Sequence, residues 1–162
     1  MNSSFDRAAG GKDEWLTPPE IVEALGPFDL DPCAPIVRPW PTAGLHYTKE
    51  DDGLYRPWIG RVWCNPPYGT ETGKWLKRLS EHGDGIALIF ARTETSNFFQ
   101  YIWPKAQGIL FIKGRLSFYN VDGTRGNNSA GAPSCLIAYG QYNADILKGC
   151  GILGKYLPIT ED

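Results

Sequence analysis

The chain of 162 residues lacks any hydrophobic run close to the roughly 20 residues that a membrane-spanning helix needs. Its polar start, MNSSFDRAAGGKDEW, also lacks the apolar segment of a signal peptide. Charge is balanced as well, with 16 Lys and Arg against 18 Asp and Glu, which argues against binding nucleic acid by bulk charge alone. We therefore expect a soluble, intracellular protein with one domain and a locally built binding site.

Metal-binding and disulfide patterns are missing too. The four cysteines, Cys33, Cys64, Cys135 and Cys150, form no C-x-x-C pair, and only two histidines accompany them. Scattered cysteines of this kind favour reduced thiols over a zinc site or a disulfide framework. We expect no metal.

The sequence does contain the alternating segments typical of an α/β fold. RVWCN and the continuous apolar run GIALIFA predict strands, the second covered on both faces. GKWLKRLSEHG and SNFFQYIWPKA predict helices, the second capped by Ser96, and ILFIKGRLSFYN and SCLIAYG are rich in strand-forming residues. The order strand, helix, strand, helix, strand, strand predicts a mainly parallel sheet with helices on both faces and a C-terminal antiparallel hairpin.

The N-terminal part is less regular. TPPEIVEALG predicts a helix with Thr17 as its cap and Gly26 as its end, and FDLDPCA predicts a short strand that runs into a turn. A further short strand is expected over 45–48, inside a segment rich in Pro, Gly and Trp. These patterns divide the chain into a flexible terminus, a single domain and a C-terminal extension, at residues 1–12, 13–142 and 143–162.

The stretch VWCNPPYG carries the strongest chemical signal, because two prolines end what looks like a core strand. Residues before proline favour extended backbone and proline donates no N–H, so the turn is stiff and presents mainly acceptors. Such acceptors suit a planar exocyclic amine such as N6 of adenine, whose two hydrogens they can bind. Tyr68 adds a ring on which an extruded base can stack, a contact worth about 1–3 kcal/mol. The alternative is a plain Pro-Pro turn with a packing tyrosine.

NPPY resembles the catalytic motif, Asp/Asn-Pro-Pro-Tyr/Phe, of amino-group methyltransferases that use S-adenosylmethionine (SAM). The segments W-x-TPP, DLDPCA, DGL, NPPYG, ART-x-T and KGRLSF follow in matching order over residues 15–140. This combination is similar to the phage-type DNA N-6-adenine methyltransferase family. The resemblance implies an abbreviated Rossmann-like fold, SAM as cofactor, and site-specific methylation of a flipped-out adenine in DNA at N6. It also implies a cytoplasmic location in a bacterial or phage-infected cell.

The resemblance implies roles for particular residues. The catalytic turn would hold the base through Asn65, Pro66, Pro67 and Tyr68. SAM would contact Trp15, Thr17, Pro18, Asp31, Pro32, Cys33, Asp52, Gly53, Leu54 and Asn65. Within this set Thr17 would reach the amino-acid part of SAM and Asp52 its adenine amine, although Asp51 is an open alternative. DNA would lie against Tyr68, Lys74, Arg92, Thr93, Arg115 and Arg125, while basic side chains on a helix can equally serve only to solvate it.

Other functions stay open at this point. DPCAP lacks the glycines that let the backbone approach SAM in most such enzymes, and the segment from Asp31 to Asn65 is too short for two strand–helix units. The same turn also serves methylation of guanine amines in RNA and of glutamine amides in proteins. A nucleic-acid-binding module without catalytic activity is a third hypothesis.

Overall fold

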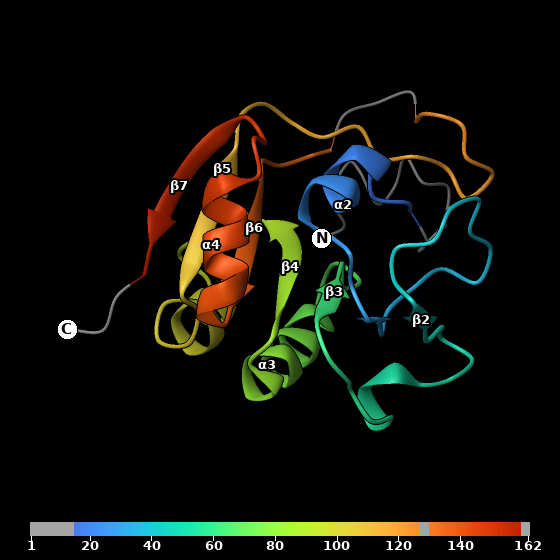
Figure 1. Ribbon diagram of the computed structural model, residues 1–162, viewed down its shortest axis with the longest axis horizontal. Coiled ribbons are helices and arrows are strands. Elements are labelled where there is room, and N and C mark those ends of the chain that lie inside the picture. Colours follow the sequence, from blue (N-terminus) through green and yellow to red (C-terminus); the bar gives the residue numbers. More distant parts are fainter. Residues whose placement is uncertain (1–14, 127–129, 160–162) are drawn as a thin grey trace.

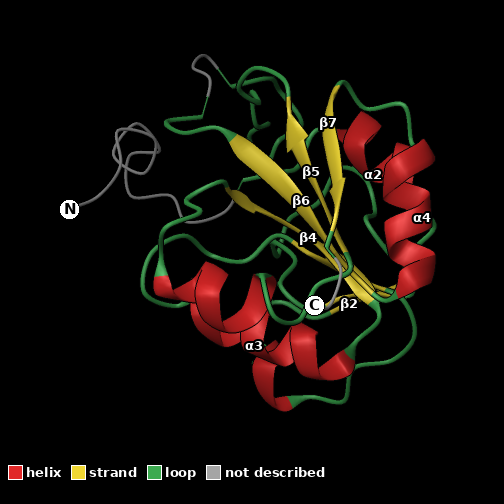
Figure 2. Cartoon of the chain, turned by 90° about the vertical axis from the view of Figure 1, so that its left-hand side faces the viewer, coloured by secondary structure: helices red, strands yellow, loops and turns green. Residues whose placement is uncertain are grey.

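The computed structural model describes residues 15–126 and 130–159, so the terminus expected at 1–12 lies outside the described residues. Its strands are β1 (Leu30–Asp31), β2 (Leu45–His46), β3 (Val62–Cys64), β4 (Gly85–Phe90), β5 (Gly108–Ile112), β6 (Ser134–Tyr139) and β7 (Gly154–Pro158). Its helical elements are α2 (Pro19–Leu25), the 3-10 turn η1 (Gly53–Tyr55), α3 (Thr72–His82), the π-helical turn η2 (Phe98–Ile102) and α4 (Gln141–Gly149). The strands form one sheet with α2 and α4 on one face and α3 on the other, so the predicted α/β fold with helices on both faces is confirmed (Figure 2).

The direction of the strands changes halfway across the sheet, whose order is β2-β1-β3-β4-β6-β5-β7. The first four strands run parallel, whereas β6 lies between β4 and β5 and pairs antiparallel with both, as β7 does with β5 (Figure 1). The prediction of a mainly parallel sheet was wrong, because the antiparallel pairs involve the longest strands. The described residues between β5 and β6 contain no helix, which suits antiparallel neighbours, and the antiparallel pairing of β5 with β6 confirms the predicted C-terminal antiparallel pair.

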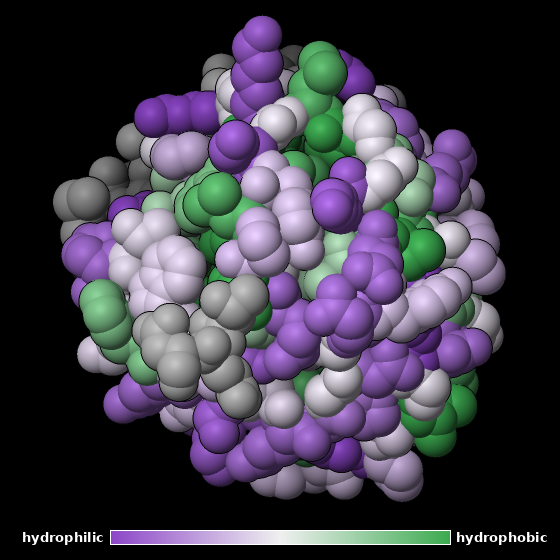
Figure 3. Space-filling model, turned by 60° about the vertical axis from the view of Figure 1, so that its left-hand side comes forward, coloured by the Kyte–Doolittle hydropathy of each residue, from purple (hydrophilic) through white to green (hydrophobic). Residues whose placement is uncertain are grey.

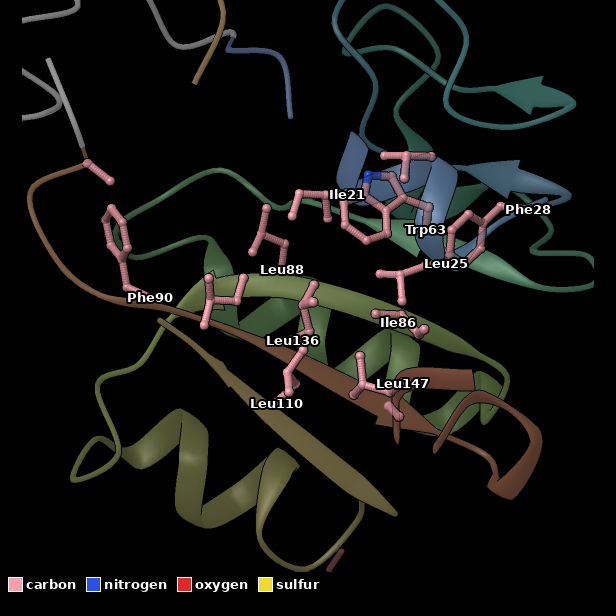
Figure 4. Packing of buried hydrophobic residues seen from close by; sticks show 14 of the residues in the cluster. Ile21, Leu25, Phe28, Trp63, Ile86, Leu88, Phe90, Leu110, Leu136 and Leu147 are labelled. Carbon is pink, nitrogen blue, oxygen red and sulfur yellow. The ribbon is translucent and has the colours of Figure 1, made fainter. Parts of the chain in front are cut away.

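The central strand β4 explains the continuous apolar run of the sequence. Ile86, Leu88 and Phe90 pack in a core with residues of α2 and α4, which Figure 4 shows. Ala87 and Ile89 pack on the opposite face, in a second core with residues of α3 and η2. Successive side chains of a strand point to opposite faces, so a strand between two cores has no polar position.

The helices α2 and α3 end at the predicted glycines, but the starts of α2 and η2 do not have the predicted side-chain caps. Gly26 and Gly83 follow the last turns of α2 and α3, and Gly83 adopts a left-handed backbone with φ 78°. No side chain caps the start of α2 or η2 within the described residues, so the predictions of Thr17 and Ser96 as caps were wrong. A proline in the first turn of α2 needs no capping partner, because it has no N–H.

Residues after position 142, which we expected to form an extension, supply most of α4 and all of β7. Ala144 and Leu147 of α4 are buried in the first core, and β7 pairs with β5 along its length.

The side of the molecule that carries β7 in Figure 1 comes forward in Figure 3, where polar groups cover most of the visible surface and hydrophobic groups are scattered.

A small hairpin over residues 118–126 packs on the segment that precedes α2. Leu16 and Tyr119 exchange two backbone hydrogen bonds, of 2.9 and 3.0 Å. Phe118 is buried, and Tyr119 packs edge-on against Trp40 with 5.3 Å between ring centroids. The hairpin therefore contacts two segments that are far from it in the sequence, one around Leu16 and one around Trp40.

Candidate functional site

The Asn-Pro-Pro-Tyr turn leaves β3 at the carboxyl edge of the parallel strands. Nδ2 of Asn65 donates a hydrogen bond of 3.1 Å to Oγ1 of Thr17. Oδ1 of Asn65 is buried and has no hydrogen-bond partner in residues 15–126 and 130–159. Because an unpaired buried polar atom costs about 1–3 kcal/mol, this oxygen is suited to accept a hydrogen bond from a ligand.

Asp31 ends β1 and holds the loop that follows it. Its side chain accepts hydrogen bonds from the backbone N–H of Cys33 (3.1 Å) and from the hydroxyl of Thr42. Burial raises the pKa of Asp31 from 3.8 to about 6, although both hydrogen bonds and the charge of Arg38 act in the opposite direction. Both carboxylate oxygens of Asp31 therefore hold the loop after β1 in place.

The two acidic residues of EDDGL have different surroundings. Oδ2 of Asp51 accepts a 2.8 Å hydrogen bond from the backbone of Thr48 and closes a turn. The side chain of Asp52 is exposed and has no hydrogen-bond partner among the described residues. Asp52 has φ 58° and is the only non-glycine residue in the described chain with a positive φ, a conformation that concentrates at functional sites. Of the two, Asp52 has the carboxylate that a ligand can reach.

Gly53 brings the EDDGL segment against the loop after β1. A Cβ atom at this position would collide with the carbonyl oxygen of Pro32, so no larger residue fits there. The indole of Trp58 donates a 2.9 Å hydrogen bond to the carbonyl of Gly53. Arg78 of α3 donates to the carbonyl of Leu54 (2.6 Å) and lies 4.7 Å from the centre of the Trp58 ring. Arg78 is therefore a structural residue that fastens this segment to α3.

These contacts join the predicted cofactor residues at one edge of the sheet. β1 and β3 are parallel neighbours, so Asp31 and Asn65 leave the sheet on the same side. Gly53 adds the EDDGL segment and Thr17 adds the segment before α2, through the contacts described above. The other residues of the predicted set lie on these segments: Trp15, Pro18, Pro32, Cys33, Asp52 and Leu54.

A cleft of about 320 Å³ lies next to the turn, on the face of the sheet that α3 covers. Tyr68 lines it and stacks on Phe90, with 4.3 Å between ring centroids and 6° between planes. Arg92, which follows β4, is an exposed cation at the cleft. The remaining lining residues are Gly69, Thr72, Leu76, Ile89, Thr95, Asn97 and Phe98. The cleft combines an aromatic wall, several hydrogen-bonding groups and one positive charge.

The other residues predicted to contact DNA do not line this cleft. Lys74 forms an exposed ion pair of 3.2 Å with the glutamate three residues earlier, and Thr93 accepts a hydrogen bond through its carbonyl. Arg115 donates to a backbone carbonyl at 3.3 Å, and Arg125 lies on the hairpin, where it bonds the hydroxyl of Tyr119 at 3.0 Å. Both arginines are exposed and follow β5 in the chain.

Sequence reasoning missed several residues of the site. Thr42 binds Asp31 across the loop after β1, and Thr72, Thr95 and Asn97 line the cleft. The last three lie on the connections that follow β3 and β4. Because ligands of open α/β sheets bind beyond the carboxyl ends of the strands, polar residues just after predicted strands were the signal that could have found them.

The described residues contain no helix long and apolar enough to cross a membrane. They also contain no group of three or more His, Cys, Asp and Glu side chains that could hold a metal ion.

The fold is that of an α/β protein with an open sheet, and the candidate site lies at the sheet edge where open α/β enzymes bind their ligands. Residues 6–149 match the family described as DNA N-6-adenine-methyltransferase (Dam), and the chain belongs to this family. The protein is therefore an enzyme, a DNA methyltransferase that modifies N6 of adenine. Methyltransferases of this kind generally use SAM. No curated protein and no solved structure shows significant similarity to the chain.

Proposed function

We propose that this enzyme transfers the methyl group of SAM to N6 of an adenine flipped out of DNA, at a specific site, and that Asn65, Pro66, Pro67 and Tyr68 form its catalytic turn. The observation that carries the proposal is the buried Oδ1 of Asn65, which has no partner within the described chain. An amine hydrogen of adenine N6 is the donor that this oxygen lacks. The carbonyl of Pro66, in a turn stiffened by two prolines, is the second acceptor.

The proposed fold is an abbreviated Rossmann-like methyltransferase fold, built as a single domain whose predicted range of 13–142 is extended to include α4 and β7, because both pack in the same sheet and core. The parallel half of the sheet, β2-β1-β3-β4, supports it, because both the loop after β1 and the catalytic turn leave that half at the same edge. Only β2 and η1 lie between β1 and β3, which accounts for the short spacing of the two motifs. With DNA as substrate, we place the enzyme in the cytoplasm of a bacterial or phage-infected cell.

For SAM we propose the edge formed by Thr17, Asp31, Asp52 and Asn65, together with the neighbouring residues Trp15, Pro18, Pro32, Cys33, Gly53 and Leu54. The residues fit this cofactor, because Asp52 offers an unpaired carboxylate to its adenine amine and the charge of Asp31 suits its cationic groups. Bound SAM supplies an electrophilic methyl group on a positively charged sulfonium.

For the target base we propose stacking on Tyr68, whose ring is held in place by Phe90. A ring fixed before binding loses little freedom on stacking, which favours capture of the base. Arg92 supports binding of a phosphate at the cleft, and we propose further contacts to DNA from Lys74, Thr93, Arg115 and Arg125.

The chemistry that we derive for the chain needs neither a covalent intermediate nor a strong general base. The lone pair of N6 is delocalised into the ring, and two acceptors that bind both N6 hydrogens favour the pyramidal geometry needed for attack. The surplus proton can leave after the methyl group has been transferred. Positioning and electrostatic stabilisation by fixed acceptors therefore supply most of the rate.

The first test is incubation with labelled SAM and, separately, DNA, RNA and protein. We expect label only in DNA, at N6 of adenine. Label confined to RNA or protein would end the proposal, and a folded protein that binds no SAM by calorimetry would favour a binding module without activity.

The second test is Asn65→Ala, which removes the unpaired acceptor. We expect turnover to fall by at least about 100-fold, as when one preorganised hydrogen-bonding group is removed from a catalytic site, with SAM affinity nearly unchanged. Ser80→Ala is the control, because it removes a hydroxyl that bonds only the backbone of α3. Wild-type turnover in Asn65→Ala would refute the role of this side chain.

A further inference from the structure

The hydroxyl of Thr17 is the hydrogen-bond partner of the Asn65 amide. An amide carries a donor at Nδ2 and an acceptor at Oδ1, so a turn by 180° would present the wrong group to an amine. Oγ1 of Thr17 lies 3.1 Å from Nδ2 and accepts its hydrogen bond, which leaves Oδ1 as the atom without a described partner. In this arrangement the amide has the orientation that the acceptor role requires.

Thr17 is held firmly enough to fix the orientation of another side chain. It is 4% exposed, and its neighbour Leu16 is both buried and bonded in two places to Tyr119. Pro18 follows directly and restricts the backbone of Thr17 to extended conformations. The position of the hydroxyl is thus set by the chain on both sides of it.

A hydroxyl can donate as well as accept, so Thr17 alone does not exclude the reversed amide. Its oxygen must act as the acceptor from Asn65 once its own hydrogen is donated to another group. A carboxylate of the cofactor is such a group, because Thr17 belongs to the proposed SAM site and the family resemblance implies that it reaches the amino-acid part of SAM. With the hydroxyl hydrogen used in this way, only Nδ2 of Asn65 can face Thr17.

We propose that Thr17 is a positioning residue that couples cofactor binding to the base site. When the hydroxyl of Thr17 donates its hydrogen to the cofactor, its oxygen holds the Asn65 amide with Oδ1 toward the target amine. The inference rests on the proposed function of Asn65 and extends it. It predicts that the acceptor for the base is fully prepared only after SAM has bound.

The test uses Asn65→Asp, because the two ends of a carboxylate are chemically equivalent. Both oxygens of a carboxylate accept, so orientation by Thr17 no longer matters in Asn65→Asp, and the motif of the resembling enzymes admits either residue. Thr17→Val is measured in both backgrounds at saturating SAM, and Thr17→Ser, which keeps the hydroxyl, is the matched control. Thermal unfolding confirms that each variant is folded, and calorimetry gives its SAM affinity.

With Asn65 present, we expect Thr17→Val to lower kcat by about 10-fold or more, the effect of one lost hydrogen bond at a site that depends on geometry. Thr17→Ser should retain kcat within about three-fold, and Thr17→Val in the Asn65→Asp background should cost less than about three-fold. An equal loss in both backgrounds would overturn the coupling and show that Thr17 affects turnover independently of the orientation of the Asn65 amide. If Asn65→Asp is inactive, equal kcat of Thr17→Val and Thr17→Ser overturns the inference. Wild-type turnover of Asn65→Ala would instead refute the proposed function itself.

Discussion

The buried carboxyl of Asp31 makes the stability of the protein depend on pH in an unusual direction. Burial raises its pKa from 3.8 to about 6, so the protonated form stabilises the folded state. This contribution is complete below the unfolded value of 3.8 and is lost as the pH rises through 6. Since one pKa unit corresponds to 1.36 kcal/mol, full ionisation costs the fold about 3 kcal/mol.

Urea unfolding of the wild type and Asp31→Asn over a range of pH measures this cost. The amide cannot ionise, so ionisation at this position destabilises only the wild type. The free energy of unfolding of Asp31→Asn, minus that of the wild type, should therefore increase by about 2 kcal/mol between about pH 4 and pH 7.5. A constant offset is also expected, because an amide nitrogen cannot accept one of the two bonds that Asp31 receives. The exposed Asp145→Asn is the control for the loss of one surface carboxylate. Curves of wild type and Asp31→Asn that stay parallel would refute the reasoning.

Three further predictions concern packing and the target base. Gly53→Ala places a methyl group against the carbonyl of Pro32. It should lower the free energy of unfolding, measured by urea denaturation, by about 1–3 kcal/mol. An unchanged value would contradict this close approach. Tyr68→Ala should raise the KM for DNA by about 5- to 100-fold through lost stacking, whereas Tyr68→Phe keeps the ring and should change it little; equal KM values would argue against stacking. Cys64 and Cys135 are buried, and burial raises the pKa of their thiols. A thiol reagent should therefore modify two cysteines in the native protein and all four in denaturant. Rapid modification of all four thiols in the native protein would show that Cys64 and Cys135 are accessible.

The parts of the fold that the sequence predicts are those with a local signal. The run GIALIF has six apolar residues because β4 lies between two cores, and Gly83 ends α3 because it adopts a positive φ. β7 lacks such a signal, since it is an edge strand whose side chains are mostly exposed. The position of β6 between β4 and β5 is not visible either, because it depends on how the long connection from β5 returns to the sheet.

The same distinction applies to the candidate site. The acceptor character of the catalytic turn follows from Asn65 and its two prolines alone, since proline chemistry is local. The hydrogen-bond partner of Asn65 cannot be predicted in this way, because Thr17 lies in a distant segment. Tertiary packing decides that Thr17 acts as a hydrogen-bond acceptor and not as a helix cap. Arg78 is a similar case, since its contacts with Leu54 and Trp58 arise only when η1 packs against α3.

The paired hydrogen bonds between Leu16 and Tyr119 have a consequence for biosynthesis. The ribosome delivers the segment before α2 early and the hairpin that fastens it late, because chains are made from the N-terminus at about 5–20 residues per second. The two backbone hydrogen bonds that hold Leu16, the neighbour of Thr17, can form only after the hairpin has been made. An incomplete chain that ends before Tyr119 therefore contains the Asn-Pro-Pro-Tyr turn but lacks the partner that holds Leu16, so this part of the candidate site is completed late in synthesis.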